Sequence, residues 1–234
     1  MSSSPEKADG PKAESRALVN GLFLAFEGVE GSGKSTQAAL LATYLRDRGV
    51  EVVVAREPGS TPLGERIRSL VLDEVGVGIP PRSELFLMLA ARAAFVAQVV
   101  RPAIAEGRVV IADRFELSTL AYQGAGRGLP YEIVADTNRI ATEGISPDAT
   151  ILLDLSPDEG ARRQIQAAKR PDRMERETTE FHRRVAEGYR GLSGKVSRLV
   201  RVDAAGSIEE VQGRILAELG GLFPETFASG GFIS

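Results

Sequence analysis

The chain has 234 residues, of which 43% are hydrophobic and 26% charged; this is the usage of a globular protein with a full-sized core in one or two domains, and it excludes a wholly disordered or fibrous chain. With 29 Lys and Arg against 32 Asp and Glu, the formal net charge is −3, so the overall charge does not favour a nucleic-acid partner. The chain contains no Cys, which excludes disulfides, thiolate catalysis and Cys-based metal sites, and its one histidine, His182, cannot build a multi-histidine site.

Residues 1–20 mix acidic and basic side chains without an apolar block, so they lack the layout of a secretory signal. The longest apolar candidate, residues 85–100, is interrupted by polar side chains and is shorter than the ~20 consecutive apolar residues that span a bilayer. We therefore expect a cytoplasmic protein without a membrane partner. Residues 1–20 and 224–234 have too little apolar content to fold alone, and we expect both to be flexible tails around one domain at residues 21–223.

Between these ends, short apolar runs alternate with longer patterns of helical period. This order predicts an α/β fold in which a parallel five-stranded sheet is flanked by helices. The expected strands cover residues 22–27, 51–55, 109–113, 150–155 and 197–202. The first helix is expected from Lys34 to Arg48, because Gly49 can take the left-handed conformation that ends a helix.

Three later helices have recognisable signals. The longest helical pattern covers residues 83–105, and we expect Pro102 to bend or interrupt it, because proline lacks an amide donor and crowds the preceding turn. Ser156 and Ser207 are each followed by a glutamate three residues later, so a capped helix is expected to begin after each serine. The chain shows no internal repeat and no interdomain linker, which favours a single α/β domain.

The strongest motif follows the first expected strand. The segment Gly28-Val29-Glu30-Gly31-Ser32-Gly33-Lys34-Ser35 matches the pattern G-x-x-x-x-G-K-[ST] at every fixed position, and it lies between a predicted strand and a predicted helix, as the motif requires. Its glycines let backbone amides point toward a di- or triphosphate, and the following helix adds the positive end of its dipole. We expect Lys34 to reach the terminal phosphates of ATP and Ser35 to offer its hydroxyl to Mg²⁺.

The motif alone leaves several classes of nucleotide-binding protein open. A GTPase normally reads guanine with an Asn-Lys-x-Asp segment, whereas Asn20 and Asn138 are followed by Gly and Arg, so that class is not favoured. A motor or transporter ATPase stays open, because Asp113 ends an expected strand and can face a metal. Arg114 follows it directly and adds a cation beside the phosphate site.

Three segments together make the chain resemble the thymidylate kinase family, whose members phosphorylate dTMP to dTDP. They are the loop segment Phe26 to Thr36, then Arg56-Glu57-Pro58-Gly59, then Asp113 to Gly124. They occur in the family's order, and the similarity extends from residue 22 to about residue 222. The resemblance implies a P-loop fold with a short lid at about residues 162–177, ATP and Mg²⁺ as requirements, and a homodimer formed through the helix at residues 83–105.

The physics of this reaction agrees with the residues at hand. Phosphoryl transfer to a monophosphate joins two polyanions, so cations must neutralise charge along the line of transfer. The acceptor phosphate is mostly ionised at neutral pH, since its second pKa is about 6, and a strong general base is unnecessary. A site without a usable histidine or cysteine can therefore work by positioning and electrostatics.

The resemblance also assigns phosphate and metal contacts. It implies catalytic cations at Lys34, Arg114, Arg170 and Arg173, and magnesium contacts at Ser35, Asp113 and Glu175. The ATP-binding loop is Gly28, Val29, Glu30, Gly31, Ser32, Gly33, Lys34, Ser35 and Thr36. No basic residue precedes Lys34 in this loop, so we predict the group of these kinases that draws its additional arginine from the lid.

For the acceptor nucleotide, the resemblance implies contacts from Glu30, Glu57, Pro58, Met88, Arg92, Arg114, Ser118, Tyr122 and Gln123. Glu30 would accept from the 3′-hydroxyl, and Tyr122 would pack under the deoxyribose where a 2′-hydroxyl would clash. Met88 departs from the family, which usually has a phenylalanine there to stack on thymine; a methionine can still pack on a ring through its sulfur.

Two alternatives stay beside this hypothesis. The protein can be another nucleoside or nucleotide kinase, which a panel of acceptors assayed with ATP would separate. It can also be a P-loop ATPase that switches a protein partner, and that class would release ADP without any nucleotide acceptor.

Overall fold

The computed structural model describes residues 21–73, 78–166, 171–192, 196 and 198–227. Within these ranges the chain forms a sheet of five parallel strands in the order β2-β3-β1-β4-β5. The strands are β1 (Leu22–Glu27), β2 (Val52–Arg56), β3 (Val109–Asp113), β4 (Ala149–Asp154) and β5 (Leu199–Asp203). The predicted parallel sheet is confirmed, with strand ends that differ from the expected ones by two residues at most.

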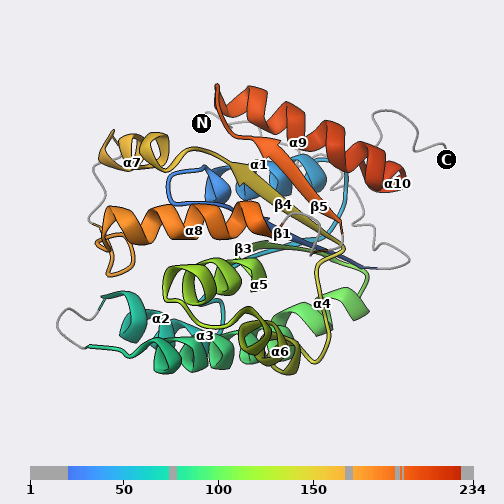
Figure 1. Ribbon diagram of the computed structural model, residues 1–234. Helices are drawn as coiled ribbons and strands as arrows, with labels where there is room; N and C mark the ends of the chain where they lie inside the picture. The colour runs from blue at the N-terminus through green and yellow to red at the C-terminus, as the bar shows by residue number, and fades with distance from the viewer. Residues whose placement is uncertain (1–20, 74–77, 167–170, 193–195, 197, 228–234) are drawn as a thin grey trace, which may run out of the picture.

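Helices connect the strands and cover both faces of the sheet (Figure 1). In the described part of the chain they are α1 (Lys34–Arg46), α2 (Pro62–Arg68), α3 (Pro81–Phe95), α4 (Arg101–Ala105), α5 (Glu116–Thr119), α6 (Tyr131–Thr142), α7 (Pro157–Gln166), α8 (Thr179–Gly191), α9 (Ile208–Leu222) and α10 (Pro224–Phe227). Three π-helical segments, η1 (Ser69–Asp73), η2 (Val96–Val100) and η3 (Leu120–Gly126), continue α2, α3 and α5.

The core has one cluster on each side of β1, whose six residues are all buried. Leu24 and Phe26 belong to the cluster that contains buried side chains of α1 and α9. Phe23 and Ala25, which point to the opposite face, belong to the cluster that contains Phe95 and side chains of η2 and α4. Figure 1 shows α1 and α9 above the sheet and α3 and α4 below it. Covering on both faces explains why the strand sequence is continuously apolar.

The site lies where the parallel strands end. In the sheet register, Phe26 of β1 and Arg56 of β2 are both opposite Asp113 of β3. Parallel strands bring their carboxyl ends to one edge, so the segments that follow these three strands meet there. Those segments are the P-loop, the Glu57 turn and the turn that begins at Arg114.

The longest expected helix, residues 83–105, is divided into α3, the π-helical turn η2 and α4. In η2 the amide of Arg101 donates to Val96 O, five residues earlier. This wider turn directly precedes Pro102, so the proline is accommodated by a π turn rather than by a break. The whole segment Pro81–Ala105 is long and apolar enough to cross a membrane by length and composition alone, and 44% of its most apolar window is buried inside the protein; one such helix is weak evidence for a membrane span.

Both predicted N-caps are present. The amide of Glu159 donates to Ser156 Oγ at 3.3 Å before α7, and Ser207 and Glu210 form a reciprocal capping box before α9. The expected C-terminal tail is wrong over its first four residues, because these form α10, whose Phe227 is buried and stacks on Tyr44. Residues 1–20 and 228–234 lie outside the described residues.

Candidate active site

The loop between β1 and α1 forms an anion cradle. Gly31 has a φ of 72° and Gly33 a φ of 93°, a region that glycine adopts readily because it has no Cβ. Gly33 is the N-cap of α1, and no side-chain cap closes that end of the helix. The first amides of α1 therefore face the loop without a side-chain acceptor, which is the arrangement of phosphate-binding helix N-termini.

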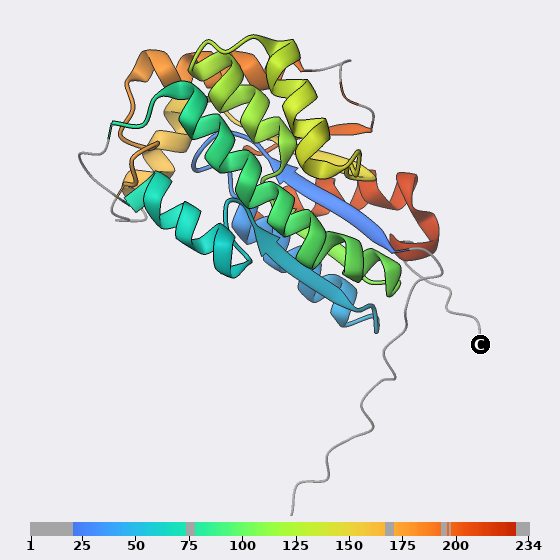
Figure 2. The same cartoon turned by 90° about the horizontal axis from the view of Figure 1, so that it is seen from below.

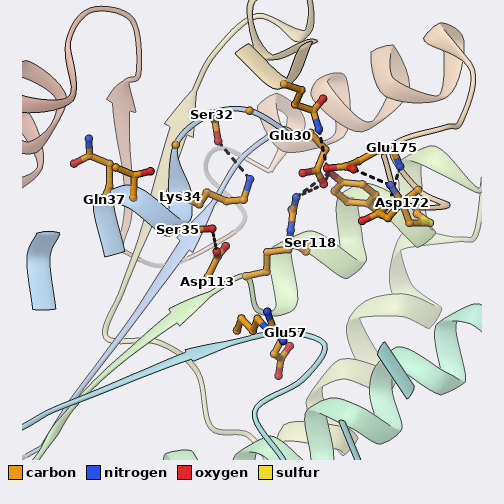
Figure 3. A pocket seen from close by; sticks show the side chains of 18 of the residues that line it. Glu30, Ser32, Lys34, Ser35, Gln37, Glu57, Asp113, Ser118, Asp172 and Glu175 are labelled. Carbon is orange, nitrogen blue, oxygen red and sulfur yellow. Dashed lines mark hydrogen bonds and ion pairs between the residues drawn. The ribbon is translucent and has the colours of Figure 1, made fainter. Parts of the chain in front are cut away.

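Lys34 folds back over this loop and is only 6% exposed. Its Nζ donates to Gly28 O at 3.1 Å and Val29 O at 2.8 Å, and to Ser32 Oγ at 3.4 Å (Figure 3). Burial and then the charge of Arg114 lower the pKa of Lys34 from 10.5 to about 8. The ammonium thus has only neutral acceptors, and a phosphate would be a stronger, charge-assisted partner.

Helix α7 begins directly against the loop. A Cβ on Gly31 would lie 2.2 Å from Gly160 O, and a Cβ on Gly160 would lie 2.2 Å from Glu30 O. Neither position has room for a side chain. The approach brings Arg163 and Gln164, about one turn later, to the wall of the same cavity as the loop. The fixed positions of the P-loop pattern are Gly28, Gly33, Lys34 and Ser35, so the motif requires neither Gly31 nor Gly160; the close approach of the two backbones does.

Ser35 and Asp113 lie together near the carboxyl ends of β1 and β3 (Figure 3), and the Ser35 hydroxyl donates to Asp113 Oδ2. Mg²⁺ prefers oxygen ligands and is usually bound through one or two carboxylates plus substrate phosphates and waters, so this pair fits the ion. Glu175 is not brought to the pair. Its carboxylate accepts from Gln164 Nε2 at 2.7 Å and from the Asp172 amide at 2.9 Å, at a distance from Ser35 in Figure 3. Among the described residues, no three His, Asp or Glu side chains form a metal cluster.

Arg114 follows β3 with a φ of 76°, a strained conformation for a non-glycine residue that costs about 1–3 kcal/mol and tends to occur at functional sites. Its guanidinium forms an ion pair with Glu30 and donates to Tyr122 Oη and to Gly28 O, both at 3.3 Å. Tyr122 donates to Glu30 at 3.0 Å. Three predicted residues from the P-loop, the β3 turn and η3 are thus in direct contact.

Ser118 lines the cavity, and its hydroxyl is hydrogen-bonded within the protein. Its hydroxyl donates to Glu27 Oε2 at 2.6 Å and accepts from Arg114 Nη1 at 3.1 Å. A serine hydroxyl has one hydrogen, so Ser118 has none left to donate to a nucleobase in this arrangement. Glu27, which is fully buried, was not among the predicted site residues, although it directly precedes the P-loop.

Arg92 is 3% exposed, and four of its five N–H donors form hydrogen bonds with protein acceptors. Nε donates to Glu57 Oε2 at 2.8 Å, and Nη2 lies 2.6 Å from the same oxygen. Nη2 also donates to Phe115 O at 2.9 Å, and Nη1 donates to Thr119 Oγ1 at 2.6 Å and to Asn138 Oδ1. Burial raises the pKa of Glu57 to about 7, against the opposing charge of Arg92. Arg92 lines the cavity, but most of its donors already have protein partners, so it has at most one N–H to offer to a nucleotide without releasing one of them.

Helix α3 places Glu84, Met88 and Arg92 four residues apart, and so on one face. Met88 lines the cavity, as expected. Glu84 is fully buried and accepts from Gln123 Nε2 at 2.8 Å and from Arg127 Nη2 at 3.0 Å. An ionised carboxylate only accepts hydrogen bonds. The Gln123 amide therefore turns its NH₂ group to Glu84, which leaves its carbonyl oxygen for a nucleobase.

The lid arginines do not match the expectation in full. Arg173 donates to Glu84 Oε2 at 2.5 Å and to Val71 O at 2.6 Å, so it is held by a buried carboxylate on α3 and does not line the cavity. In this structure its guanidinium is directed to Glu84 and Val71 O, and its phosphate contact stays a prediction. Arg170 lies outside the described residues.

One cavity of about 730 Å³ joins the P-loop to this acceptor side. Among the predicted residues, its walls include Glu30, Gly31, Ser32, Gly33, Lys34, Ser35, Thr36, Glu57, Pro58, Met88, Arg92, Asp113, Arg114, Ser118, Tyr122, Gln123 and Glu175. The prediction from the sequence did not include a second set of lining residues, among them Gln37, Arg56, Arg68, Thr119, Asp172, Met174 and the start of α9. The sequence contained a signal for two of them. Arg56 directly precedes the predicted site residue Glu57, and the start of α9 has the serine–glutamate spacing of a capping box.

Comparisons with known proteins agree with this geometry. The thymidylate kinase family model matches residues 26–215. The chain belongs to the thymidylate kinase family. It is 44% identical over 211 residues to a thymidylate kinase of Symbiobacterium thermophilum, covering 90% of this chain and 98% of that protein. It is 48% identical over 195 residues to a thymidylate kinase of a Synechococcus species, strain JA-3-3Ab, covering 83% and 93%.

A solved structure supports the same family. The crystal structure of thymidylate kinase from Ehrlichia chaffeensis matches with a TM-score of 0.68 and 31% sequence identity, over 86% of this chain and 99% of that chain. The family's reaction, phosphorylation of dTMP to dTDP, is therefore the activity that the comparisons support. They do not favour the other nucleotide kinases or the ATPase switch considered from the sequence.

Proposed function

We propose that this protein transfers the γ-phosphoryl group of ATP to dTMP, and that Lys34 and Arg114 are its catalytic cations. The observation that carries the proposal is the single cavity that has the P-loop at one end and Met88, Tyr122 and Gln123 at the other. Two nucleotides bound in one cavity can place the acceptor phosphate in line with the γ-phosphate. Lys34 would exchange its neutral acceptors for phosphate oxygens, and Arg114 would neutralise charge between the two nucleotides.

Mg²⁺ would be held by Ser35 and Asp113 together with ATP oxygens and waters. When bound, the ion would supply charge neutralisation on the β- and γ-phosphates. The hydrogen bond between the Ser35 hydroxyl and Asp113 supports this assignment, because both oxygens already face one another. Glu175 lies with the lid and is not part of this pair.

Three sets of side chains that line the cavity would recognise the acceptor nucleotide. Glu30 and Tyr122, which hydrogen-bond to each other, would bracket the deoxyribose. Met88 would pack against the base through its sulfur, while the Gln123 carbonyl oxygen would accept from thymine N3–H. Cytosine has an acceptor at N3, so the same oxygen would disfavour it.

The lid would contribute an arginine to the ATP phosphates. The P-loop has no basic residue before Lys34, and Arg163 from α7 already lines the cavity, where its Nη2 donates to Ala204 O at 3.1 Å. Arg163 and Arg170 are therefore the candidate lid arginines. Arg173 would hold the Glu84 carboxylate instead of contacting phosphate.

We infer a cytoplasmic homodimer. The apolar face that supports this inference is formed by exposed side chains of α3 and α6, which pack side by side (Figure 2). It comprises Phe86, Ala90, Ile133 and Ile140, and we call it the α3–α6 face. Three of its members, Phe86, Ile133 and Ile140, are large side chains exposed by 62%, 50% and 75%, which is typical of a surface that a second copy covers.

The test of the proposed reaction is the dependence of ADP release on the acceptor. With Mg²⁺ and ATP, dTMP is expected to accelerate ADP release by orders of magnitude, and mass spectrometry should detect dTDP in equal amount. Parallel reactions with dUMP, dCMP, dGMP and UMP measure the preference for dTMP. ADP release at the same rate without any acceptor would contradict the proposal and indicate an ATPase.

A further inference from the structure

Tyr189, near the end of α8, has a buried hydroxyl that the proposed reaction does not use. The residue is 3% exposed, and it is not among the residues that line the cavity. Its Oη lies 3.0 Å from Glu27 Oε2, 3.0 Å from Ser118 Oγ and 3.3 Å from Arg114 Nη1. The hydroxyl thus lies between a buried carboxylate and the guanidinium that faces the phosphates.

Glu27 provides a rigid base for this hydroxyl. The carboxylate ends β1 and is fully buried, and its Oε1 accepts from the amides of Phe115 and Ser118 at 2.8 Å and 3.0 Å. Its Oε2 accepts from the hydroxyls of Ser118 and Tyr189. Four donors from two other parts of the chain therefore fix the carboxylate, and a fully hydrogen-bonded buried group of this kind specifies one geometry.

Counting hydrogens assigns the direction of each bond. Ser118 has one hydroxyl hydrogen, and its shortest contact, 2.6 Å, directs that hydrogen to Glu27. Tyr189 directs its hydrogen to the same carboxylate. Burial raises the pKa of Tyr189 well above its usual value, and Glu27 adds to this effect, so the hydrogen stays in place at neutral pH. The Tyr189 oxygen is therefore free to accept from Arg114.

We propose that Tyr189 is a positioning residue for Arg114: anchored on Glu27, its hydroxyl holds the guanidinium where the phosphoryl group passes. The inference rests on the proposed function of Arg114. Because Arg114 has a strained backbone and its Nη2 is held by Glu30, the acceptors on Nη1 decide how the guanidinium plane lies. Those acceptors are Gly28 O, Ser118 Oγ and Tyr189 Oη. Tyr189 belongs to the helix after the lid, so α8 becomes part of the catalytic framework.

The first experiment is Tyr189→Phe, which removes the hydroxyl and keeps the ring. We expect kcat to fall about tenfold, because a small misplacement of a catalytic group slows transfer without changing what binds. KM for ATP and for dTMP should stay within about twofold, the signature of an interaction that matters in the transition state. Tyr44→Phe is the matched control. Tyr44, like Tyr189, donates its hydroxyl to a protein oxygen, which here is Phe227 O at 3.1 Å, but it does not line the cavity. The kcat of this variant should be unchanged.

A double-mutant cycle separates positioning from a general structural effect. In an Arg114→Ala background, Tyr189→Phe should lower kcat by less than about twofold, because the group that it positions is gone. A structural role would give the same tenfold loss in both backgrounds. If Tyr189→Phe does not fold, Ser118→Ala tests the same network, with the same expected fall in kcat and the same non-additivity with Arg114→Ala.

Wild-type kcat in Tyr189→Phe, or an equal loss of kcat in Tyr44→Phe, would overturn the proposal. An additive cycle would overturn it as well, as would a change confined to KM. Failure of the proposed function would look different, because the wild-type protein itself would then release ADP without regard to dTMP.

Discussion

Lys34 shows at the scale of a single residue how burial prepares the site for an anion. Its ammonium has Gly28 O, Val29 O and Ser32 Oγ as neighbours, and none of these carries a full negative charge. Replacement by methionine keeps the length of the side chain and removes the charge. We expect Lys34→Met to reduce kcat by about 10²–10³-fold, the usual effect of losing one electrostatic contact to a transition state.

The measurement for Lys34→Met is the initial rate of dTDP formation at saturating ATP and dTMP. Arg139→Met is the control, because Arg139 is a highly exposed cation on α6 that does not line the cavity. Thermal unfolding should show both variants folded. A Lys34→Met enzyme with wild-type turnover would show that the lysine does not contact phosphate.

The lowered pKa of Lys34 also predicts a pH dependence of ATP binding. Below pH 8 the free protein already has a protonated ammonium for the phosphates, since burial and Arg114 lower the pKa only to about 8. Above that pH the amine is neutral and must take up a proton when ATP binds. The affinity for Mg²⁺-ATP is therefore expected to fall as pH rises from 8 to 9.5, by at most about tenfold per pH unit for one proton.

Calorimetric titration at pH 7 to 9.5 checks this dependence. At pH 9, buffers with different ionisation enthalpies should reveal uptake of up to one proton per ATP. In Lys34→Met the uptake should be absent. An affinity that is flat across this range in the wild-type protein would contradict the low pKa.

At the scale of an element, α9 depends on its N-terminal cap. Ser207 Oγ accepts from the amide of Glu210 at 3.2 Å, and the Glu210 side chain accepts from the amide of Ser207 at 2.8 Å. Ser207→Ala removes the first bond and is expected to lower the free energy of unfolding by about 1 kcal/mol. Chemical denaturation measures the change, and Ser207→Asp, which can still cap the helix, should restore most of the loss. Equal stability of all three proteins would show that the cap does not contribute.

At the scale of the whole molecule, the α3–α6 face decides whether the protein pairs with a second copy. Phe86 has the largest side chain of this face and is 62% exposed. An arginine there would place a charge in the centre of an apolar contact, which is costly unless it is paired. Phe86→Arg is therefore expected to convert a dimer to a monomer, measured by light scattering after size-exclusion chromatography. Gln98→Arg, on α3's continuation in η2, is the control, and a dimer that survives Phe86→Arg would place the interface elsewhere.

Much of the fold and half of the site could be predicted from local patterns in the sequence. The sheet, the P-loop and both serine caps depend on neighbours in the sequence, such as the strand–loop–helix order around Lys34. The prediction of a flexible tail was wrong at Pro224–Phe227, because this segment packs on Tyr44, which is far away in the chain. The position of Arg173 could not be predicted either, because Glu84, 89 residues away, holds its guanidinium.

The sequence by itself determined which groups are available: a glycine-rich loop, one lysine, Asp113 next to Arg114, and no thiol or imidazole suited to the chemistry. The tertiary structure alone decided how these groups use their hydrogen bonds. Arg92 donates four of its five N–H groups to protein acceptors, Ser118 gives its hydrogen to Glu27, and Tyr189 reaches Arg114 from 75 residues away. The physical reason is that a donor is satisfied by whichever acceptor folding brings within 3 Å, and distance in space is not written in the spacing of the chain.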